Sequence, residues 1–258
     1  NEIIDISVLS ELINLEELSL YDNNLINISN LSNLDQLKDL SISDNRIKDI
    51  TALTKLKKLE KLSISNNRVE EIPILADFTY LGILHLDNNN IKDISSIAGL
   101  KQLYFLNLEN NEIEEISAVA ELTNLKDLYL NDNTYISDIT PLAKLRKLRH
   151  LSLSNNRIVE ISVIEKLEDL RYLYLSNNQI YKIDVIEGLE ILDLVFLNIN
   201  NITDIQPLIN NTNIKKYHTV DVSNNPLDLG DCPNLQILID RDVDLKHNIP
   251  CEDINDFN

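Results

Sequence analysis

The sequence predicts an α/β solenoid, in which short parallel strands stack along one side of the chain and short helical segments stack along the other. Three observations predict it. Segments of 22 residues with the same pattern recur from Leu15 onward. Each segment begins with alternating apolar and polar residues, which is typical of a strand with one buried face. Asn recurs at the ninth position, which indicates one packing arrangement used many times.

The segments fit the pattern LxxLxLxxNxIxxIxxLxxL, which is the leucine-rich-repeat signature. The signature predicts a right-handed horseshoe arc whose parallel sheet lines the concave face. Short α or 3₁₀ segments are expected on the convex face. The repeats begin at Leu15, Leu37, Leu59, Leu81, Leu103, Leu125, Leu148, Leu170, Leu192 and, degenerately, Tyr217.

The recurring Asn is predicted to be structural. Its side chain both donates and accepts, so we expect it to satisfy the backbone groups of the turn that follows each strand. A Ser or Thr follows the second Ile of most repeats, as at Thr51 and Ser95, and is expected to cap the outer segment. The predicted ladder comprises Asn23, Asn45, Asn67, Asn89, Asn111, Asn133, Asn156, Asn178, Asn200 and Asn225.

Two repeats exceed 22 residues. The pair Thr134 and Tyr135 replaces one residue, which predicts a small bulge. The repeat that begins at Leu192 has 25 residues, with the excess at 209–214. We expect this excess to be a tolerated loop on the outer side.

The sequence predicts two regions. Residues 1–227 form the repeat array, with a partial repeat at 1–14 and about ten repeats after it, and residues 228–258 form a C-terminal cap. Asn1 falls at the ladder position, so the chain starts in mid-repeat and a longer protein is expected. Cys232 and Cys251 both lie in the cap, and this placement favours a disulfide and an oxidising compartment, whereas two free thiols would fit the cytosol.

The net charge is −19, which argues against binding to nucleic acid or anionic lipid surfaces. No apolar run is long enough to span a membrane, and residues 1–12 lack the features of a signal peptide, so a soluble chain without membrane insertion is expected. The basic clusters at 55–61 and 144–149 are interpreted as solvated surface.

The sequence contains no nucleotide-binding or metalloprotease motif, and we predict neither cofactor, metal nor enzymatic activity. Asp127, His150 and Ser152 fall close together in the repeat register, but an open sheet offers no oxyanion hole. The strand-end carboxylates Asp22, Asp44 and Asp132 occur singly, one per repeat, so solvated charge is the favoured interpretation over a cation site.

The repeat register points the third, fifth and seventh positions at the concave face. Early repeats place small polar residues there, whereas the fifth to ninth repeats place aromatic rings there. Exposed aromatic clusters are typical of protein-binding sites. The predicted partner-binding residues are Phe105, Tyr129, Tyr172, Tyr174, Phe196 and Leu194, with Tyr104 and His150 at the rim.

Units such as LKDLSISDNRIKDITALTKLKK resemble those of the internalins, surface proteins of Listeria and related Gram-positive bacteria. The resemblance implies a secreted or cell-surface protein of adhesion, host recognition and virulence, whose concave face binds a protein such as a host surface receptor. Similar repeats occur in the regulatory subunit of protein phosphatase 1 and in dynein-associated light chains. They imply the alternative, a cytoplasmic scaffold that docks a phosphatase or a motor protein.

Overall fold

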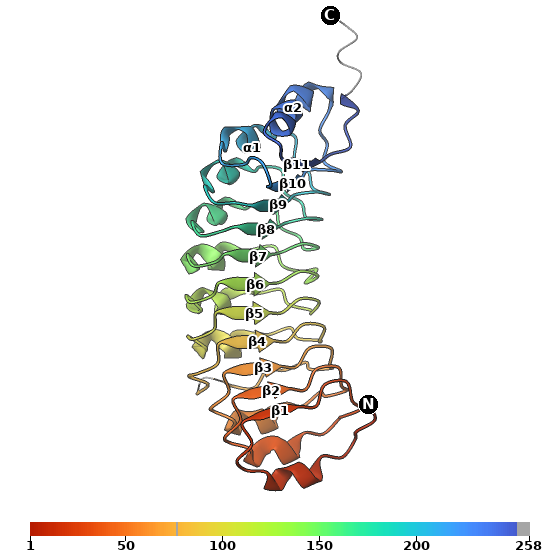
Figure 1. The fold of residues 1–258 in the computed structure, drawn as a ribbon, viewed down its shortest axis with the longest axis vertical. Helices are drawn as coiled ribbons and strands as arrows, with labels where there is room; N and C mark the ends of the chain where they lie inside the picture. Colours follow the sequence, from red (N-terminus) through yellow and green to blue (C-terminus); the bar gives the residue numbers. More distant parts are fainter. Residues whose placement is uncertain (76, 252–258) are drawn as a thin grey trace, which may run out of the picture. The chain divides into compact units, whose positions relative to one another are not determined.

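The computed structural model describes residues 1–75 and 77–251, and the chain divides into two compact units, Asn1–Ile136 and Ser137–Asn258. In each unit the chain winds as a coil, with strands stacked along one side and helical segments along the other (Figure 1). The predicted fold class, a leucine-rich-repeat solenoid with a parallel sheet, is therefore confirmed. None of the helices in the described ranges has the length and apolar character needed to cross a membrane.

The described residues of unit 1 form six parallel strands of three residues, which pair in chain order. Equivalent repeat positions lie opposite each other, so that Leu18 pairs with Leu40 and Leu84 with Leu106. The register therefore follows the repeat pattern. The strands are β1 (Glu17–Ser19), β2 (Asp39–Ser41), β3 (Lys61–Ser63), β4 (Ile83–His85), β5 (Phe105–Asn107) and β6 (Asp127–Tyr129).

The outer segments of unit 1 are single 3₁₀ turns. They are η1 (Ser7–Glu11), η2 (Ser29–Asn33), η3 (Thr51–Lys55), η4 (Ser95–Gly99) and η5 (Ser117–Glu121). No helix is described between β3 and β4, where Pro73 stands and where residue 76 is not described. Glu71 instead forms an isolated parallel bridge with Asp93.

Unit 2 repeats the arrangement, with five parallel strands in chain order between residues 137 and 251. The strands are β7 (His150–Ser152), β8 (Tyr172–Tyr174), β9 (Leu194–Phe196), β10 (Thr219–Asp221) and β11 (Asp244–Lys246). The helical segments are η6 (Thr140–Lys144), η7 (Ser162–Lys166), η8 (Asp184–Gly188), α1 (Gln206–Asn210), η9 (Leu229–Asp231) and α2 (Cys232–Asp240).

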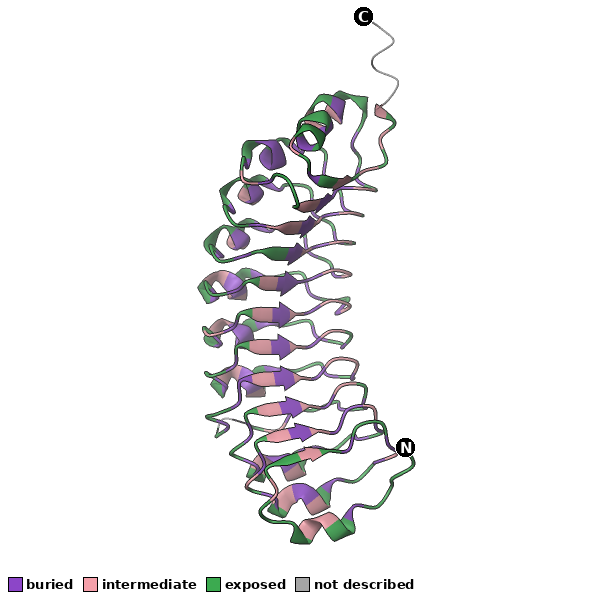
Figure 2. Cartoon of the chain, in the orientation of Figure 1, coloured by how far each residue is buried: buried purple, intermediate pink, exposed green. Residues whose placement is uncertain are grey.

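The core consists of Leu and Ile columns that the repeat supplies in every turn. The central strand residue and the residue just after the strand point inward, and Leu40, Ile42, Leu106 and Leu108 are fully buried. The strand residues on either side of the central one are more exposed (Figure 2). Each buried Leu contributes about 1.5–3 kcal/mol by leaving water. The sheet face opposite the core, which we call the open face, is therefore not needed for packing.

The Asn ladder is confirmed. The Asn45 amide donates to the carbonyls of Leu20 and Ile42 at 3.0 and 3.1 Å, and its oxygen accepts from the Leu25 N–H at 2.9 Å. Asn178 makes the equivalent bonds in unit 2. Because backbone groups buried without a partner are costly, the ladder holds consecutive coils together.

The expected Ser and Thr caps are wrong. The residue at the N-cap of these 3₁₀ turns is an Ile without a side-chain bond, and Thr51 is already the first residue of its turn. The side chain of Asp49, two residues earlier, accepts from the Thr51 N–H at 2.8 Å. Asp93 accepts from Ser95 in the same way. An Asx turn therefore starts the outer segment.

The expected surface loop at 209–214 is wrong in part, because Ile209, Asn211 and Ile214 are buried, whereas Asn210 and Thr212 are exposed. Asn211 is only 2% exposed and donates to the carbonyls of Ile186 and Leu189. Arg241 at the end of α2 donates to the carbonyls of Ile209 and Asn211. The insertion thus joins α1 to the C-terminal residues.

Residues 244–246 of unit 2 continue the sheet. β11 pairs with β10 in parallel, and a disulfide joins Cys232 of α2 to Cys251, with their Cα atoms 5.5 Å apart. Residues 252–258 of the predicted cap lie outside the described residues. The division into an array and a cap stays a prediction.

Candidate functional site

Three rings form a continuous row on the open face of unit 1. The centroids of His85 and Phe105 are 4.7 Å apart, and those of Phe105 and Tyr129 are 5.4 Å apart. The rings are partly exposed and come from β4, β5 and β6, whose central Leu residues are buried beneath them. We call this group the unit 1 ring row. It offers an aromatic surface that the core does not use.

Four rings gather on the open face of unit 2. His150 of β7 lies 5.5 Å from Tyr172 and 5.2 Å from Tyr174, both on β8. Tyr174 stacks on Phe196 of β9 at 5.3 Å and an interplanar angle of 21°. Leu194 pairs in register with Tyr172 and is half-buried. We call these rings the unit 2 ring cluster.

The structure thus distributes the predicted binding residues over both units. Phe105 and Tyr129 belong to unit 1, whereas Tyr172, Tyr174 and Phe196 belong to unit 2. Within each unit, direct ring contacts connect them. These side chains stand on the open face, so the packing of the core does not explain why aromatic rings occupy these positions.

The two predicted rim residues differ in their surroundings. His150 contacts two tyrosine rings and so lies inside the unit 2 ring cluster. Tyr104 precedes β5, is 43% exposed and packs on the backbone of Gly82. The Lys126 ammonium lies 5.9 Å from the centroid of the Tyr104 ring. Tyr104 therefore stands at the N-terminal end of the strands.

Sequence reasoning missed two members of these surfaces. His85 occupies the fifth repeat position, as Tyr129 does, but is not among the predicted partner-binding residues. Its Phe105 contact shows that it belongs to the row. Lys246 of β11 lies with its ammonium 5.6 Å from the Phe196 centroid. The sequence did not predict Lys246 as part of this surface, because the repeat pattern is lost before β11.

Burial sets the electrostatics of both surfaces. It lowers the pKa of His85, with Lys61 adding to the effect and Asp87 opposing it, which favours the neutral imidazole. It raises the pKa of the Tyr174 phenol, which stays protonated. Burial likewise raises the pKa of Glu109, and Asp132 and Asp87 add to this effect while an Asn131 hydrogen bond opposes it.

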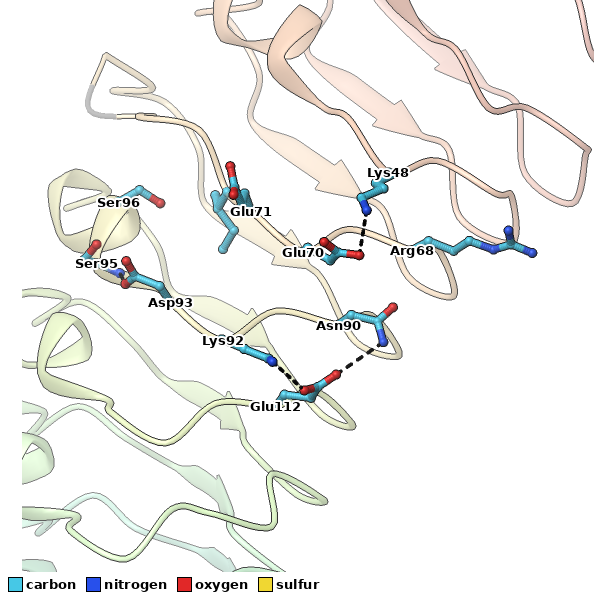
Figure 3. Close-up of a pocket in the computed structure, with 11 residues that line it drawn as sticks. Lys48, Arg68, Glu70, Glu71, Asn90, Lys92, Asp93, Ser95, Ser96 and Glu112 are labelled. Carbon is cyan, nitrogen blue, oxygen red and sulfur yellow. Dashed lines mark hydrogen bonds and ion pairs between the residues drawn. The ribbon is translucent and has the colours of Figure 1, made fainter.

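A hollow of about 1040 Å³ lies on the flank of unit 1, beside the chain that leads away from β2, β3, β4 and β5 (Figure 3). Its charged side chains pair with each other, as Lys48 with Glu70 at 2.8 Å and Lys92 with Glu112 at 3.2 Å. Such exposed pairs contribute little energy. The lining residues of the hollow carry charges of both signs and include no aromatic ring, so the hollow is a weaker candidate than the open face.

Of the residues that the register brings together, Asp127 belongs to unit 1, whereas His150 and Ser152 belong to unit 2. Ser152 is only 4% exposed, and His150 is engaged with the rings of Tyr172 and Tyr174. Among residues 1–75 and 77–251, no group of three or more metal-ligating side chains is found. The carboxylates of Asp22, Asp44 and Asp132 belong to residues with φ of 55–56°, a left-handed turn position that Asn and Asp tolerate.

The model of leucine-rich repeats in two copies matches residues 35–77, 81–121, 105–144 and 146–190, which is more than half of the chain. The chain therefore belongs to the leucine-rich-repeat family, and its repeats are internalin-like. Such repeats are protein-binding modules, and in this family they form interaction scaffolds rather than enzymes. No curated protein sequence matches the chain.

Solved structures show the same fold. An internalin from Listeria monocytogenes is 29% identical, with a TM-score of 0.80 over 96% of this chain and 79% of that one. Internalin C2 from the same organism is 30% identical, with a TM-score of 0.58 over 81% of each chain. A plant peptide hormone receptor, solved as a complex, is 18% identical, with a TM-score of 0.66 over 96% of this chain and 54% of that one.

Proposed function

We propose that the chain is the recognition domain of a bacterial surface or secreted protein, and that it binds a partner protein on the open face of its sheet. The partner is a host surface receptor, and the role is adhesion. The proposal depends above all on one observation, the gathering of aromatic rings on strands whose packing does not require them.

The physical argument starts from the cost of leaving rings in water. Tyr174 and Phe196 stand at the fifth repeat position, where each of the first three repeats carries Ser. Phe105 stands at the third position, where the first three repeats carry a charged residue. The fold therefore tolerates polar residues at both positions. Aromatic side chains bury large areas on binding and lose little rotamer freedom, which is why they anchor interfaces. The resemblance to internalins supports a surface or secreted location.

The binding residues are tested with a triple variant of unit 2, in which Tyr172, Tyr174 and Phe196 are replaced by Ala. Biotinylated wild-type protein is incubated with a solubilised membrane fraction of animal cells and with cytosol, and captured proteins are identified by mass spectrometry. We expect a membrane protein captured by the wild type and lost with the variant, since interface anchors contribute about 2 kcal/mol or more each.

A matched control replaces Tyr80 and Tyr217, which are 64% and 86% exposed and lie outside the strands. This control variant should capture the same protein as the wild type. The melting temperature of the triple variant should stay close to that of the wild type, because the replaced rings lie outside the core. Capture that survives the triple substitution, or that comes from cytosol alone, would refute the proposal.

A further inference from the structure

The open face of unit 1 carries two carboxylates beside its ring row. Asp87 and Glu109 stand two residues beyond His85 and Asn107, so they project from the same face as those strand residues. Both are half-buried. The two charges act on each other, because Asp87 contributes to raising the pKa of Glu109. The ring row is therefore bordered by an acidic edge.

The hydrogen-bond partners of these carboxylates are neutral. The Ser65 hydroxyl donates to Asp87 at 2.6 Å and the Asn88 amide donates to it at 2.9 Å. The Asn131 amide donates to Glu109 at 3.5 Å. In the described ranges, no Lys, Arg or His side chain lies within ion-pairing distance of either carboxylate.

Several other carboxylates of unit 1 are compensated by a Lys side chain. Lys48 pairs with Glu70, Lys101 pairs with Glu121, and Lys61 on the open face pairs with Asp39 at 3.4 Å. Half-burial without a counter-ion is unfavourable, as the raised pKa of Glu109 shows. A cation supplied from outside would remove this cost. A surface with rings and two uncompensated carboxylates therefore complements a cationic group.

We propose that the unit 1 ring row and its acidic edge take an arginine side chain from a basic segment of the partner protein. This inference rests on the proposed function, and it assigns a chemistry to the partner. A guanidinium is planar, stacks on aromatic faces and pairs with two carboxylate oxygens at once. The net charge of −19 attracts basic partners over a longer range and raises their rate of association.

The proposal is tested with a phage-displayed random dodecapeptide library, panned on the wild-type protein. We expect the selected peptides to be enriched in Arg, with aromatic or aliphatic neighbours. The peptide that binds most tightly is then synthesised, and its Kd is measured for the wild type and for the double variant Asp87→Asn/Glu109→Gln. The Kd should rise at least about tenfold, because a charge-assisted contact is lost.

The matched control is Glu114→Gln/Glu115→Gln, which removes two exposed carboxylates away from the strands. It changes the net charge equally and should leave the Kd nearly unchanged. If both double variants raised the Kd equally, the overall negative charge of the protein would account for the attraction, and the proposal would be overturned. A replacement of the peptide Arg by Gln should weaken binding to the wild type, but not to Asp87→Asn/Glu109→Gln.

A further variant, Phe105→Ala, separates this inference from the proposed function. If the selected peptides lacked Arg but bound Phe105→Ala more weakly than the wild type, the docking function would be supported and the arginine proposal would be overturned. Recovery of no peptide, or of peptides that Phe105→Ala binds equally well, would count against both. Calorimetric titration with calcium chloride alone should give no heat of binding. Calcium uptake that is lost in Asp87→Asn/Glu109→Gln would assign the acidic edge to a metal ion instead.

Discussion

Ile199 adopts a φ of 58° at the turn position that Asn177 holds one repeat earlier with a φ of 53°. The other repeats carry Asp or Asn at this position, in a left-handed conformation that Asn and Asp tolerate because their short polar side chains bond locally. A β-branched side chain in this region is strained. Ile199 is also 47% exposed, so its side chain gains little from packing.

We predict that Ile199→Asn stabilises the protein by about 1 kcal/mol, the order of the left-handed penalty for a residue with a Cβ. Thermal unfolding followed by circular dichroism measures the effect. Ile191→Asn is the matched control, because Ile191 is 39% exposed without a positive φ. Its melting temperature should not rise. If Ile199→Asn lowers the melting temperature, the Ile side chain makes contacts that outweigh the backbone strain.

The repeat register predicted most of this fold because packing and hydrogen bonding recur identically. Leu40 and Leu106 are buried at the positions that the alternation indicates, and Asn45 bonds as its chemistry requires. The register also placed the aromatic rings on the open face. It could not show which rings touch, since contacts such as His85 with Phe105 depend on rotamers across two strands.

Features outside the repeat were predicted less well. The excess residues 209–214 looked like a loop, but Asn211 finds two carbonyl acceptors and is buried. Pattern matching counts residues and does not account for backbone groups that need partners. β11 was missed because the C-terminal residues lack the Leu spacing, although the strand pairs with β10 through backbone groups that any sequence supplies.

The Asx turns of unit 1 make stability depend on pH. Backbone hydrogen bonds from Thr51 and Ser95 lower the pKa of Asp49 and Asp93 below the ordinary value of 3.8. A carboxyl with a lowered pKa in the folded state stabilises above its ordinary value, and this contribution is lost as the pH falls through the folded value. We expect acid to loosen the starts of η3 and η4.

We therefore predict that Asp49→Asn/Asp93→Asn reduces the loss of melting temperature on acidification from neutral pH to about pH 3. Asn keeps the acceptor without the charge, as Asn27 does for the Ser29 N–H at 2.8 Å. The control is Asp169→Asn, which removes an exposed carboxylate outside these turns. An acid sensitivity of the double variant equal to that of wild type would show that other carboxyl groups dominate.

The disulfide between Cys232 and Cys251 predicts a reductant-sensitive C-terminal end. The bond joins two residues that are 19 positions apart in the sequence, and the loop that it closes contains α2 and β11. Replacing both residues by Ser should lower the stability of this region by about 3 kcal/mol, the value expected for a loop of this size. Intact mass after alkylation, with and without reductant, should differ by two modified thiols. Alkylation of both thiols before reduction would contradict the bond and favour a cytoplasmic protein.

The role of Tyr104 at the rim is tested through Gly82, on which its ring packs. A Cβ at Gly82 would lie 2.6 Å from the Cε1 atom of Tyr104, so Gly82→Ala must displace the ring. Tyr104→Ala and Gly82→Ala should each weaken binding of the selected dodecapeptide by about threefold, since rim contacts contribute less than about 1 kcal/mol.

The double variant Gly82→Ala/Tyr104→Ala decides whether the two residues act together. Because the added methyl group acts only by moving the ring, the double variant should bind as weakly as Tyr104→Ala alone, and not more weakly. Melting temperatures should change little, because the ring is 43% exposed. If Gly82→Ala weakens binding further in the absence of the Tyr104 ring, the methyl group itself obstructs the partner, and the surface at the start of β4 belongs to the interface.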